Sequence, residues 1–138
     1  MSHVLQTLTR LALAAFMVSA GVGHFRSTDS FMAQVPPFLP YPELIIYISG
    51  VVEIVLAAGL VVAKRHRARV GWTLAAFYVV IFPGNISQYL TGPSAFGLDT
   101  DSARATRLLF QPVLIALALW STGAWAEFIA KRRSVRPN

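Results

Sequence analysis

Residues 43–63 of the chain read ELIIYISGVVEIVLAAGLVVA. After Glu43 at its start, this stretch carries one charged residue, Glu53, and it ends just before Lys64. An α-helix rises about 1.5 Å per residue, so a run of this length spans the roughly 30 Å hydrocarbon core of a bilayer. Because lipid offers no hydrogen bonds to the backbone, the stretch predicts a membrane-spanning helix.

Three further apolar runs of similar length lead to the same interpretation. They cover about residues 4–24, 70–90 and 105–128, and no charged residue occurs from 70 to 98 or from 108 to 126. Charged residues make up 13% of the 138 residues and apolar residues 55%, whereas an average soluble domain has about 25% charged residues. The sequence therefore predicts a single all-α membrane domain over residues 1–138, with four transmembrane helices in an antiparallel bundle.

The basic residues predict the orientation of this bundle. Eight of the twelve Lys and Arg residues lie in two clusters, 64–69 and 131–136, which four spans would place on one side of the membrane. Cytoplasmic loops are rich in such residues, so both termini are predicted to be cytoplasmic, in the plasma or inner membrane. Membrane lipid is then the expected partner of the positive charge, and nucleic acid is not. A cleavable signal peptide ending near residues 18–20 is an alternative that the late position of Arg10 disfavours.

The segment between the first two predicted helices is rich in proline and apolar residues. Residues 25–42 hold four prolines, and Ser27-Thr28-Asp29 is able to cap a short helix through Gln34. Proline lacks a backbone donor and disfavours helix in the residue before it, so this helix is expected to end at Val35-Pro36-Pro37. We expect a partly helical outer loop that either covers the mouth of the bundle or anchors in the head-group region.

Several polar residues lie where a bilayer excludes them, all predicted in or near the outer half of the bundle. A charged side chain at the centre of a membrane helix costs about 2.5–3.5 kcal/mol if it faces lipid, so it is expected to face the bundle. The similar depth of these residues on four helices predicts one polar pocket that opens outward. The alternative is a set of structural hydrogen bonds that hold the helices together. The candidate ligand-binding residues are His24, Glu53, Asn85, Gln88, Arg107 and Gln111.

The surroundings of these residues refine the expectation. Pro83 cannot donate to the backbone one turn earlier, which predicts a bend in the third helix beside Asn85. Arg107 either reaches inward toward Glu53 or extends outward to the head groups, whereas the deeper Gln111 is expected to bond across helices. His24 closes the first helix, so its position along the sequence places it roughly half a bilayer from Glu53, unless a loop or a kink brings the two residues together.

Residues typical of common catalytic sites are missing from the sequence. The chain has no cysteine, no phosphate-binding glycine loop and no His–Glu spacing typical of a metal site. A single intramembrane carboxylate cannot supply the paired acids of a glycosidase. The sequence therefore favours a protein without catalytic activity of its own, and it predicts no metal.

The chain resembles the DoxX-like family of small four-helix membrane proteins in several motifs over about residues 10–120. Gly84 departs from the family pattern, in which alanine is expected, and this departure should only loosen the bend. The resemblance implies the same four-helix fold, and it covers His24, Glu53, Asn85, Arg107 and Gln111. The motifs are Gly21-x-x-His24-Phe25, Val35-Pro36-Pro37-x-Leu39-Pro40, Tyr47-x-Ser49-Gly50-x-x-Glu53, Phe82-Pro83-Gly84-Asn85 and Arg107-x-x-x-Gln111.

Some relatives in that family are membrane subunits of quinone-linked sulfur oxidation or oxidant-defence complexes, and a distant animal branch assists receptor assembly. The resemblance therefore implies an accessory subunit of a membrane redox system. We expect it to bind a quinone-like or other amphipathic molecule, or lipid, in the polar pocket. A redox protein would be its partner, and a homo-oligomer is compatible with this role. The alternatives are a non-catalytic assembly or scaffold subunit and a proton-coupled small transporter that uses Glu53.

Overall fold

The computed structural model describes residues 1–91 and 100–135 of the chain, and these residues form helices and no strands. Four helices are long and apolar enough to cross a membrane, which confirms the predicted all-α class and the four candidate spans and indicates a multi-pass membrane protein. The spans are α1 (Ser2–Arg26), α3 (Pro42–Val62), α4 (Arg67–Thr91) and α5 (Asp101–Ser121), and the shorter helices are α2 (Thr28–Met32) and α6 (Ala124–Ser134).

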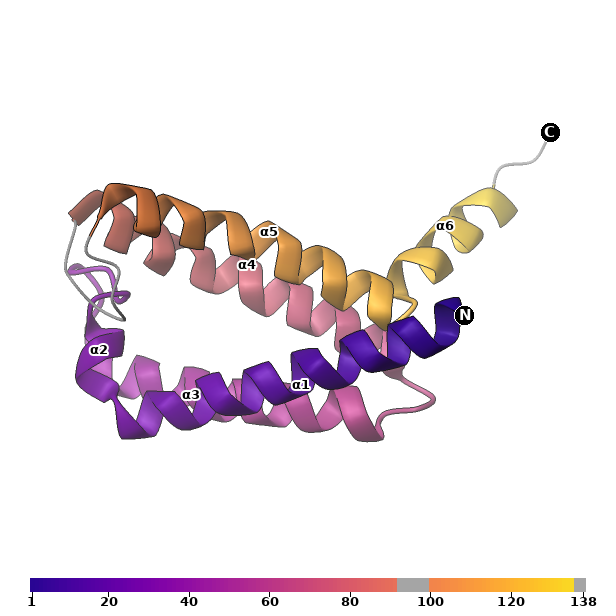
Figure 1. Ribbon diagram of the computed structural model, residues 1–138, viewed down its shortest axis with the longest axis horizontal. Coiled ribbons are helices and arrows are strands. Elements are labelled where there is room, and N and C mark those ends of the chain that lie inside the picture. Colours follow the sequence, from indigo (N-terminus) through magenta and orange to yellow (C-terminus); the bar gives the residue numbers. More distant parts are fainter. Residues whose placement is uncertain (92–99, 136–138) are drawn as a thin grey trace.

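The long helices form two pairs. α1 packs along α3, and α4 packs along α5, so that Figure 1 shows two layers that approach each other at the end where the N-terminus lies. At the opposite end, α2 and the non-helical residues 33–41 lie between the layers. We call residues 33–41 the cap segment. α2 ends at Met32, short of the predicted end at Gln34.

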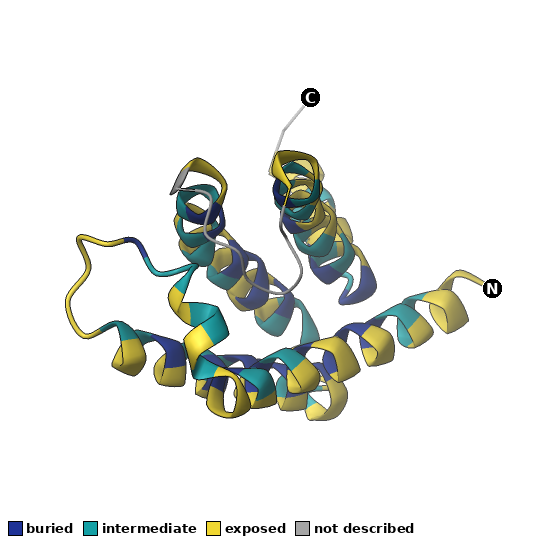
Figure 2. Cartoon of the chain, turned by 60° about the vertical axis from the view of Figure 1, so that its left-hand side comes forward, coloured by how far each residue is buried: buried dark blue, intermediate teal, exposed yellow. Residues whose placement is uncertain are grey.

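A hydrophobic core joins the two layers. It includes Met17 of α1, Leu60 of α3, Leu74 of α4 and Ala118 of α5, each of which is almost fully buried. Figure 2 shows exposed residues on the outward faces of the long helices. Many of these residues are apolar, as expected of helices that face lipid.

Two glycines allow close contact between α1 and α3. A Cβ atom at Gly21 would lie 2.9 Å from the Gly50 carbonyl oxygen, and one at Gly50 would lie 3.0 Å from the Gly21 carbonyl oxygen. Small residues at such a crossing let two helix backbones approach closely. The same crossing places His24 against Gly50 and Glu53 against Gly21, and it brings His24 beside Glu53.

The fourth apolar run differs from the continuous helix expected over residues 105–128. α5 ends at Ser121, Gly123 adopts a φ of +75°, and α6 begins at the next residue. A left-handed φ suits glycine and commonly ends a helix, because a residue without Cβ adopts it without strain. α6 therefore leaves the bundle (Figure 1).

Two side chains of α1 bond to the carbonyl groups at the end of α5. Gln6 Nε2 donates to the Trp120 carbonyl oxygen at 3.1 Å, and Arg10 Nη1 donates to the Ser121 carbonyl oxygen at 3.3 Å. The last carbonyls of a helix lack backbone partners and carry partial negative charge, so a cation is favourable there. These bonds tie the two layers together at the end where the N-terminus lies.

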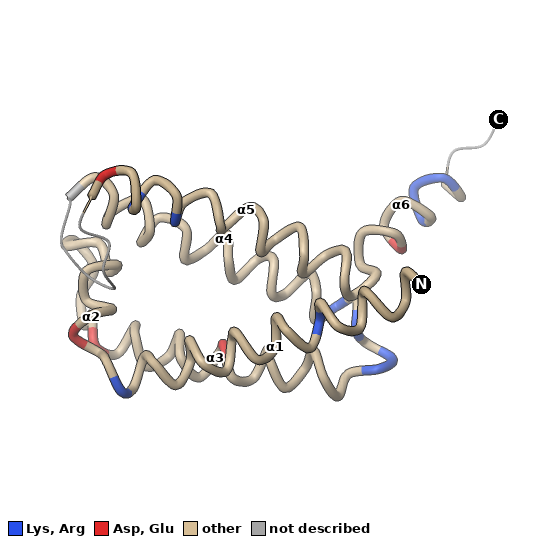
Figure 3. The backbone as a smooth tube through the Cα atoms, in the orientation of Figure 1, with Lys and Arg blue, Asp and Glu red and all other residues tan. Residues whose placement is uncertain are grey.

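Basic residues gather at this same end of the bundle (Figure 3), in the connection between α3 and α4 and on α6. On α6, Lys131 forms an ion pair of 2.8 Å with Glu127, and its hydrogen bond and charge lower the pKa of the Glu127 carboxyl. The Arg132 guanidinium lies 4.8 Å from the centre of the Phe128 ring. The clusters at 64–69 and 131–133 thus lie on one side of the bundle, opposite the cap segment.

Candidate ligand-binding cavity

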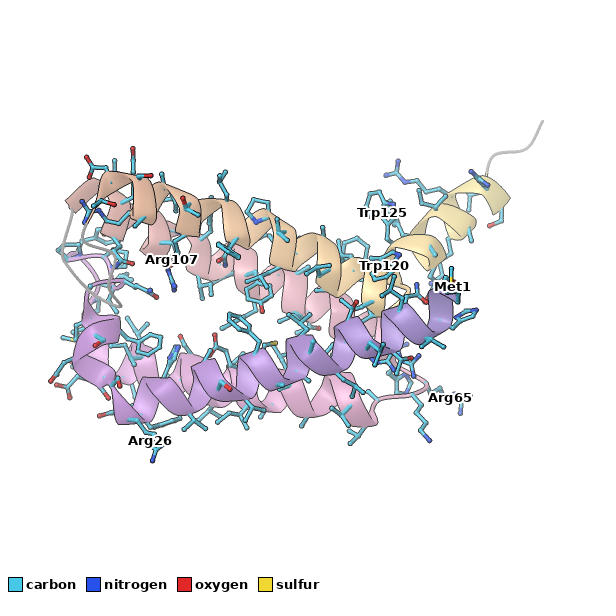
Figure 4. The ribbon with its side chains drawn as sticks, viewed as in Figure 1. Met1, Arg26, Arg65, Arg107, Trp120 and Trp125 are labelled. Atoms are coloured by element: carbon cyan, nitrogen blue, oxygen red, sulfur yellow. The ribbon has the colours of Figure 1, made fainter. Side chains whose placement is uncertain are left out.

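A cavity of about 520 Å³ lies between the two helix pairs and beside the cap segment. Residues of α1, α3, α4, α5 and the cap segment line it, and most of them are apolar. Figure 4 shows the side chain of Arg107 extending from α5 into the space between the helix pairs. The larger polar side chains along the wall are His24, Gln34, Glu53, Tyr78, Asn85, Arg107 and Gln111.

The His24 ring is held in place by α3 and α2. Its Nδ1 lies 2.8 Å from the carbonyl oxygen of Ile46, and its centroid lies 3.9 Å from that of the Phe31 ring. Because a carbonyl oxygen only accepts hydrogen bonds, Nδ1 carries a proton and donates it to Ile46. The other ring nitrogen, Nε2, lies 3.4 Å from Oε2 of Glu53.

This contact corrects the expectation that His24 and Glu53 lie half a bilayer apart. α1 continues past His24 to Arg26, and Gly50 brings α3 against the His24 Cβ atom. The expectation allowed a loop or a kink to bring the two residues together, whereas a close crossing of α1 and α3 does so in the structure.

The geometry of the pair favours a proton on one of the two side chains. A neutral imidazole with its proton on Nδ1 presents a lone pair at Nε2, and an ionised carboxylate also presents only lone pairs. Two lone pairs facing each other at 3.4 Å between buried groups repel. One proton, on His24 as imidazolium or on Glu53 as carboxylic acid, makes the contact favourable and leaves the pair without net charge.

Arg107 connects α5 with the cap segment. With the Gln34 amide oriented so that its oxygen faces the guanidinium, Arg107 donates to that oxygen from Nη2 at 2.6 Å and from Nε at 3.3 Å. Its charge also lies within electrostatic range of Glu53. Of the two expected orientations, the inward one is therefore present in the structure.

Asn85 and Gln111 form a hydrogen-bonded chain between α4 and α5. Asn85 Nδ2 donates to Gln111 Oε1 at 3.0 Å, and Gln111 Nε2 donates to the Tyr78 carbonyl oxygen at 2.8 Å. The prediction that Gln111 bonds across helices is confirmed. α4 continues as a helix through Pro83, and the Gln111 bond lies next to the carbonyl of Val79 that this proline leaves without its usual donor.

Gln88 lies outside the cavity wall. It is 1% exposed and lies almost one turn beyond Asn85, and its Nε2 has no hydrogen-bond partner within residues 1–91 and 100–135. The structure therefore brings His24, Glu53, Asn85, Arg107 and Gln111 to the cavity and leaves Gln88 in the packing beside it.

Sequence reasoning missed Gln34 and Tyr78. The Tyr78 side chain is 3% exposed, lies within electrostatic range of Glu53, and has a hydroxyl without a hydrogen-bond partner in the described part of the chain. Tyr78 precedes Asn85 by seven residues, two helical turns on the same face, and this spacing was a usable signal. Gln34 lacked such a signal because its position depends on how the cap segment folds back.

The cavity wall extends to residues on the outside of the bundle. Phe16 of α1 is 53% exposed and Val80 of α4 is 74% exposed, and both line the cavity. Both residues belong to candidate membrane spans. The cavity is therefore continuous with the surface that faces lipid.

Gly84 makes room for the backbone of the cap segment. A Cβ atom at Gly84 would overlap the carbonyl oxygen of Gln34. The expectation that glycine here only loosens a bend misses this contact, since it lies between residues far apart in the sequence. The small size of residue 84 lets the cap segment close against α4.

We expect Gly84→Ala to push the cap segment away and open the cavity. The chain has no cysteine, so a single Ser49→Cys reporter on the cavity wall should react faster with a water-soluble maleimide when Gly84→Ala is present. Gly23→Ala is a matched control, because a Cβ there would meet the Phe31 ring at an ordinary 3.5 Å. Equal labelling rates in the two backgrounds would contradict the contact between Gly84 and the cap segment.

Comparison with known families gives one match. A family model described as a domain of unknown function, DUF8561, matches residues 13–122, which is most of the chain and includes every residue of the cavity wall. No curated protein and no solved structure matches the chain. Among the described residues, no three His, Asp or Glu side chains lie together as a metal ion would require.

Proposed function

The chain belongs to the DUF8561 family, and we propose that it binds a small amphipathic molecule of quinone-like chemistry as an accessory subunit of a membrane redox system. The observation that carries this proposal is the cavity itself. It combines apolar walls with the His24–Glu53 pair, whose facing atoms lie 3.4 Å apart, and the Arg107 guanidinium, all within membrane-spanning helices. Ligand sites typically have this composition, with a few polar groups that orient a largely apolar molecule.

The proposal includes an orientation in the membrane. The four spans cross it in alternating directions as an antiparallel bundle, with the basic clusters and both termini on the cytoplasmic side. The cap segment then forms an outer loop over the cavity. The position of the basic residues at the end of the bundle opposite this segment supports the orientation (Figure 3).

The dimensions and donors of the cavity suit such a ligand. A volume of about 520 Å³ lies within the range of small-molecule sites. Quinone carbonyl oxygens accept hydrogen bonds, which Arg107 and the proton of the His24–Glu53 pair are able to donate. The exposed Phe16 and Val80 on the wall leave room for an apolar tail that enters from the lipid.

Binding of decylubiquinone to the purified protein in detergent tests the proposal. We expect it to raise the thermal unfolding temperature of the protein, and Glu53→Gln and His24→Ala to weaken this effect at each quinone concentration. Glu127→Gln, which changes a carboxylate on the exposed α6, is the matched control and should leave the effect intact. Mass spectrometry of lipids and quinones that co-purify with the protein gives an independent measurement. If neither method detects a bound molecule that Glu53→Gln weakens, the proposal is wrong.

A scaffold subunit is the second candidate function. The chain of hydrogen bonds from Asn85 through Gln111 to Tyr78 favours it, because such bonds hold helices together without any ligand. On this alternative, Glu53→Gln would lower the thermal stability of the protein and produce no separate effect on ligand binding. A stable partner protein should then be recovered from membranes with the wild-type chain.

A further inference from the structure

We infer that the basic end of the bundle holds a second site, in which Arg10, Arg67 and the Ser121 hydroxyl bind a phosphate monoester. None of these three residues lines the cavity, so the site is separate from the proposed function and does not depend on it. Three observations support it: the meeting of the three residues, the buried donor atoms without partners, and the charge around them.

The three residues come from three helices that meet at this end. Arg10 belongs to α1, Arg67 is the first residue of α4, and Ser121 is the last residue of α5. Arg10 Nη1 donates to the Ser121 carbonyl oxygen at 3.3 Å, and its guanidinium lies within electrostatic range of Arg67. One turn after Arg67, Gly71 packs so closely against α5 that a Cβ atom there would overlap Thr122 Oγ1. The start of α4 is therefore held against the end of α5.

Donor atoms without acceptors are concentrated at this place. Arg10 is 7% exposed and Ser121 is 2% exposed. The Nε atoms of Arg10 and Arg67 and the Oγ atom of Ser121 are buried and have no hydrogen-bond partner within residues 1–91 and 100–135. A buried donor without an acceptor lowers stability by its desolvation, and a bound ion is a common reason that such groups persist.

The charge of the two guanidinium groups has no counterpart at this place. Both remain ionised at all relevant pH values, and like charges in electrostatic range repel. Within the described part of the chain, neither arginine forms an ion pair, and the carboxylate of Glu127 is paired with Lys131. The Ser121 carbonyl that Arg10 contacts carries only partial negative charge. Figure 3 shows the basic residues of α1 and α4 at this end of the bundle.

A phosphate monoester fits this set of donors. It carries a charge of about −1.5 to −2 at neutral pH and presents three strong acceptor oxygens, whereas a carboxylate has one charge and two oxygens. A guanidinium matches two phosphate oxygens with its planar fork. The first N–H groups of α4 lack partners within the helix, and the start of a helix favours an anion. Two cations, a hydroxyl and a helix start therefore suit one doubly charged oxyanion.

The location of the site leaves two sources for this group. Ser121 ends a membrane span, and lipid head groups lie at the ends of spans. Arg67 is half-buried in the connection between two spans, so the site is accessible from the end of the bundle. The phosphate thus belongs either to a phospholipid such as phosphatidate or to a soluble phosphate ester, and both have the same chemistry at the site.

Three ligands test the site and distinguish the two sources. Dioctanoyl phosphatidate has the phosphate and the tails, glycerol 3-phosphate has only the phosphate, and dioctanoylglycerol has only the tails. Each is titrated into the purified full-length protein in a nonionic detergent at mildly alkaline pH and constant ionic strength, and thermal unfolding reports binding. We expect dioctanoyl phosphatidate to bind at least about 10-fold more tightly than dioctanoylglycerol. Weaker binding of glycerol 3-phosphate would indicate a lipid source, and equal binding a soluble source.

Substitutions identify the groups responsible. Arg67→Gln should weaken phosphatidate binding about 10-fold. It should leave the stability of the ligand-free protein equal or higher, because it removes a repelling charge that makes no hydrogen bond within the described residues. Ser121→Ala removes only the unpartnered hydroxyl and should also weaken binding. Arg65→Gln is the matched control, since it removes the same charge from an exposed residue of the same basic cluster, and it should leave the affinity nearly unchanged.

Two results would overturn the inference. One is equal affinity for dioctanoyl phosphatidate and dioctanoylglycerol. The other is an equal loss of binding in Arg65→Gln and Arg67→Gln, which would assign the binding to the general positive charge of this end. Arg67→Gln should leave decylubiquinone binding unchanged, so a failure of the phosphate site and a failure of the proposed function are distinguishable.

Discussion

Replacing Gly50 by alanine is expected to lower the free energy of unfolding by about 1–3 kcal/mol, the range typical of overpacked helix contacts. The added Cβ would lie 2.8 Å from the His24 Cβ, 2.9 Å from Phe25 Cε2 and 3.0 Å from the Gly21 carbonyl oxygen. The His24 Cβ and the carbonyl cannot rotate away, so α1 must move relative to α3. Thermal or denaturant unfolding in detergent, followed by circular dichroism, measures the loss.

The same displacement should impair the cavity. Gly50 holds α1 where His24 donates to the Ile46 carbonyl and contacts Glu53, so a shift of α1 would separate the pair. We therefore expect Gly50→Ala to weaken decylubiquinone binding together with stability.

Gly59→Ala is the control for the Gly50 substitution on the same helix. A Cβ there would lie 3.3 Å and 3.4 Å from the methyl groups of Val70, which are side-chain ends that are able to adjust. Alanine is favoured over glycine inside a helix by roughly 0.5–1 kcal/mol, so stability should stay equal or rise. If Gly50→Ala and Gly59→Ala changed stability alike, the close crossing of α1 and α3 near Gly21 would be wrong.

The membrane-spanning helices were predictable because lipid imposes a strict rule on sequence. A spanning segment needs about 20 predominantly apolar residues, and a long interval without charge, such as residues 70–98, satisfies this requirement directly. The end of the fourth run was less predictable by hydropathy. Ser121 to Ala126 remain uncharged, and only Gly123 signals that α5 stops and that the next residues form a separate helix.

The sequence indicated which polar residues lie at membrane depth, but it did not indicate the contacts between them. Lipid excludes polar side chains, so each one that persists at membrane depth is informative, and this rule selected His24, Asn85 and Gln111, which line the cavity. Contacts between helices depend on where they cross. The His24–Glu53 contact follows from two glycines that meet in space, and no pattern within either helix specifies their alignment.

The cap segment shows the same limit. Its prolines predicted that the short helix would run through Gln34 and stop before Pro36, but α2 ends at Met32, short of the residue that Pro36 restricts. The contacts of Gln34 with Gly84 and Arg107 join parts of the chain separated by tens of residues. An unusual glycine was visible in the sequence, but its partner was not.

His24→Leu is expected to be the most destabilising single change in the cavity, lowering the free energy of unfolding by about 3–5 kcal/mol. The substitution removes the ring whose Nε2 lies 3.4 Å from Oε2 of Glu53 and leaves the buried carboxyl group without that contact. Removing one member of a buried polar pair is more harmful than removing both, because the remaining group keeps its desolvation penalty. Equilibrium unfolding of the purified protein in detergent measures the effect.

The double variant His24→Leu/Glu53→Met decides what the pair contributes. An apolar side chain of similar length at residue 53 removes the unpartnered carboxyl, so the double variant should regain most of the stability that His24→Leu loses. Additive losses from the two substitutions would show that the side chains do not share a proton. In one outcome, the double variant regains stability while decylubiquinone binding stays absent. That outcome would show that His24 and Glu53 bind the ligand, because a purely structural role would be restored together with the packing.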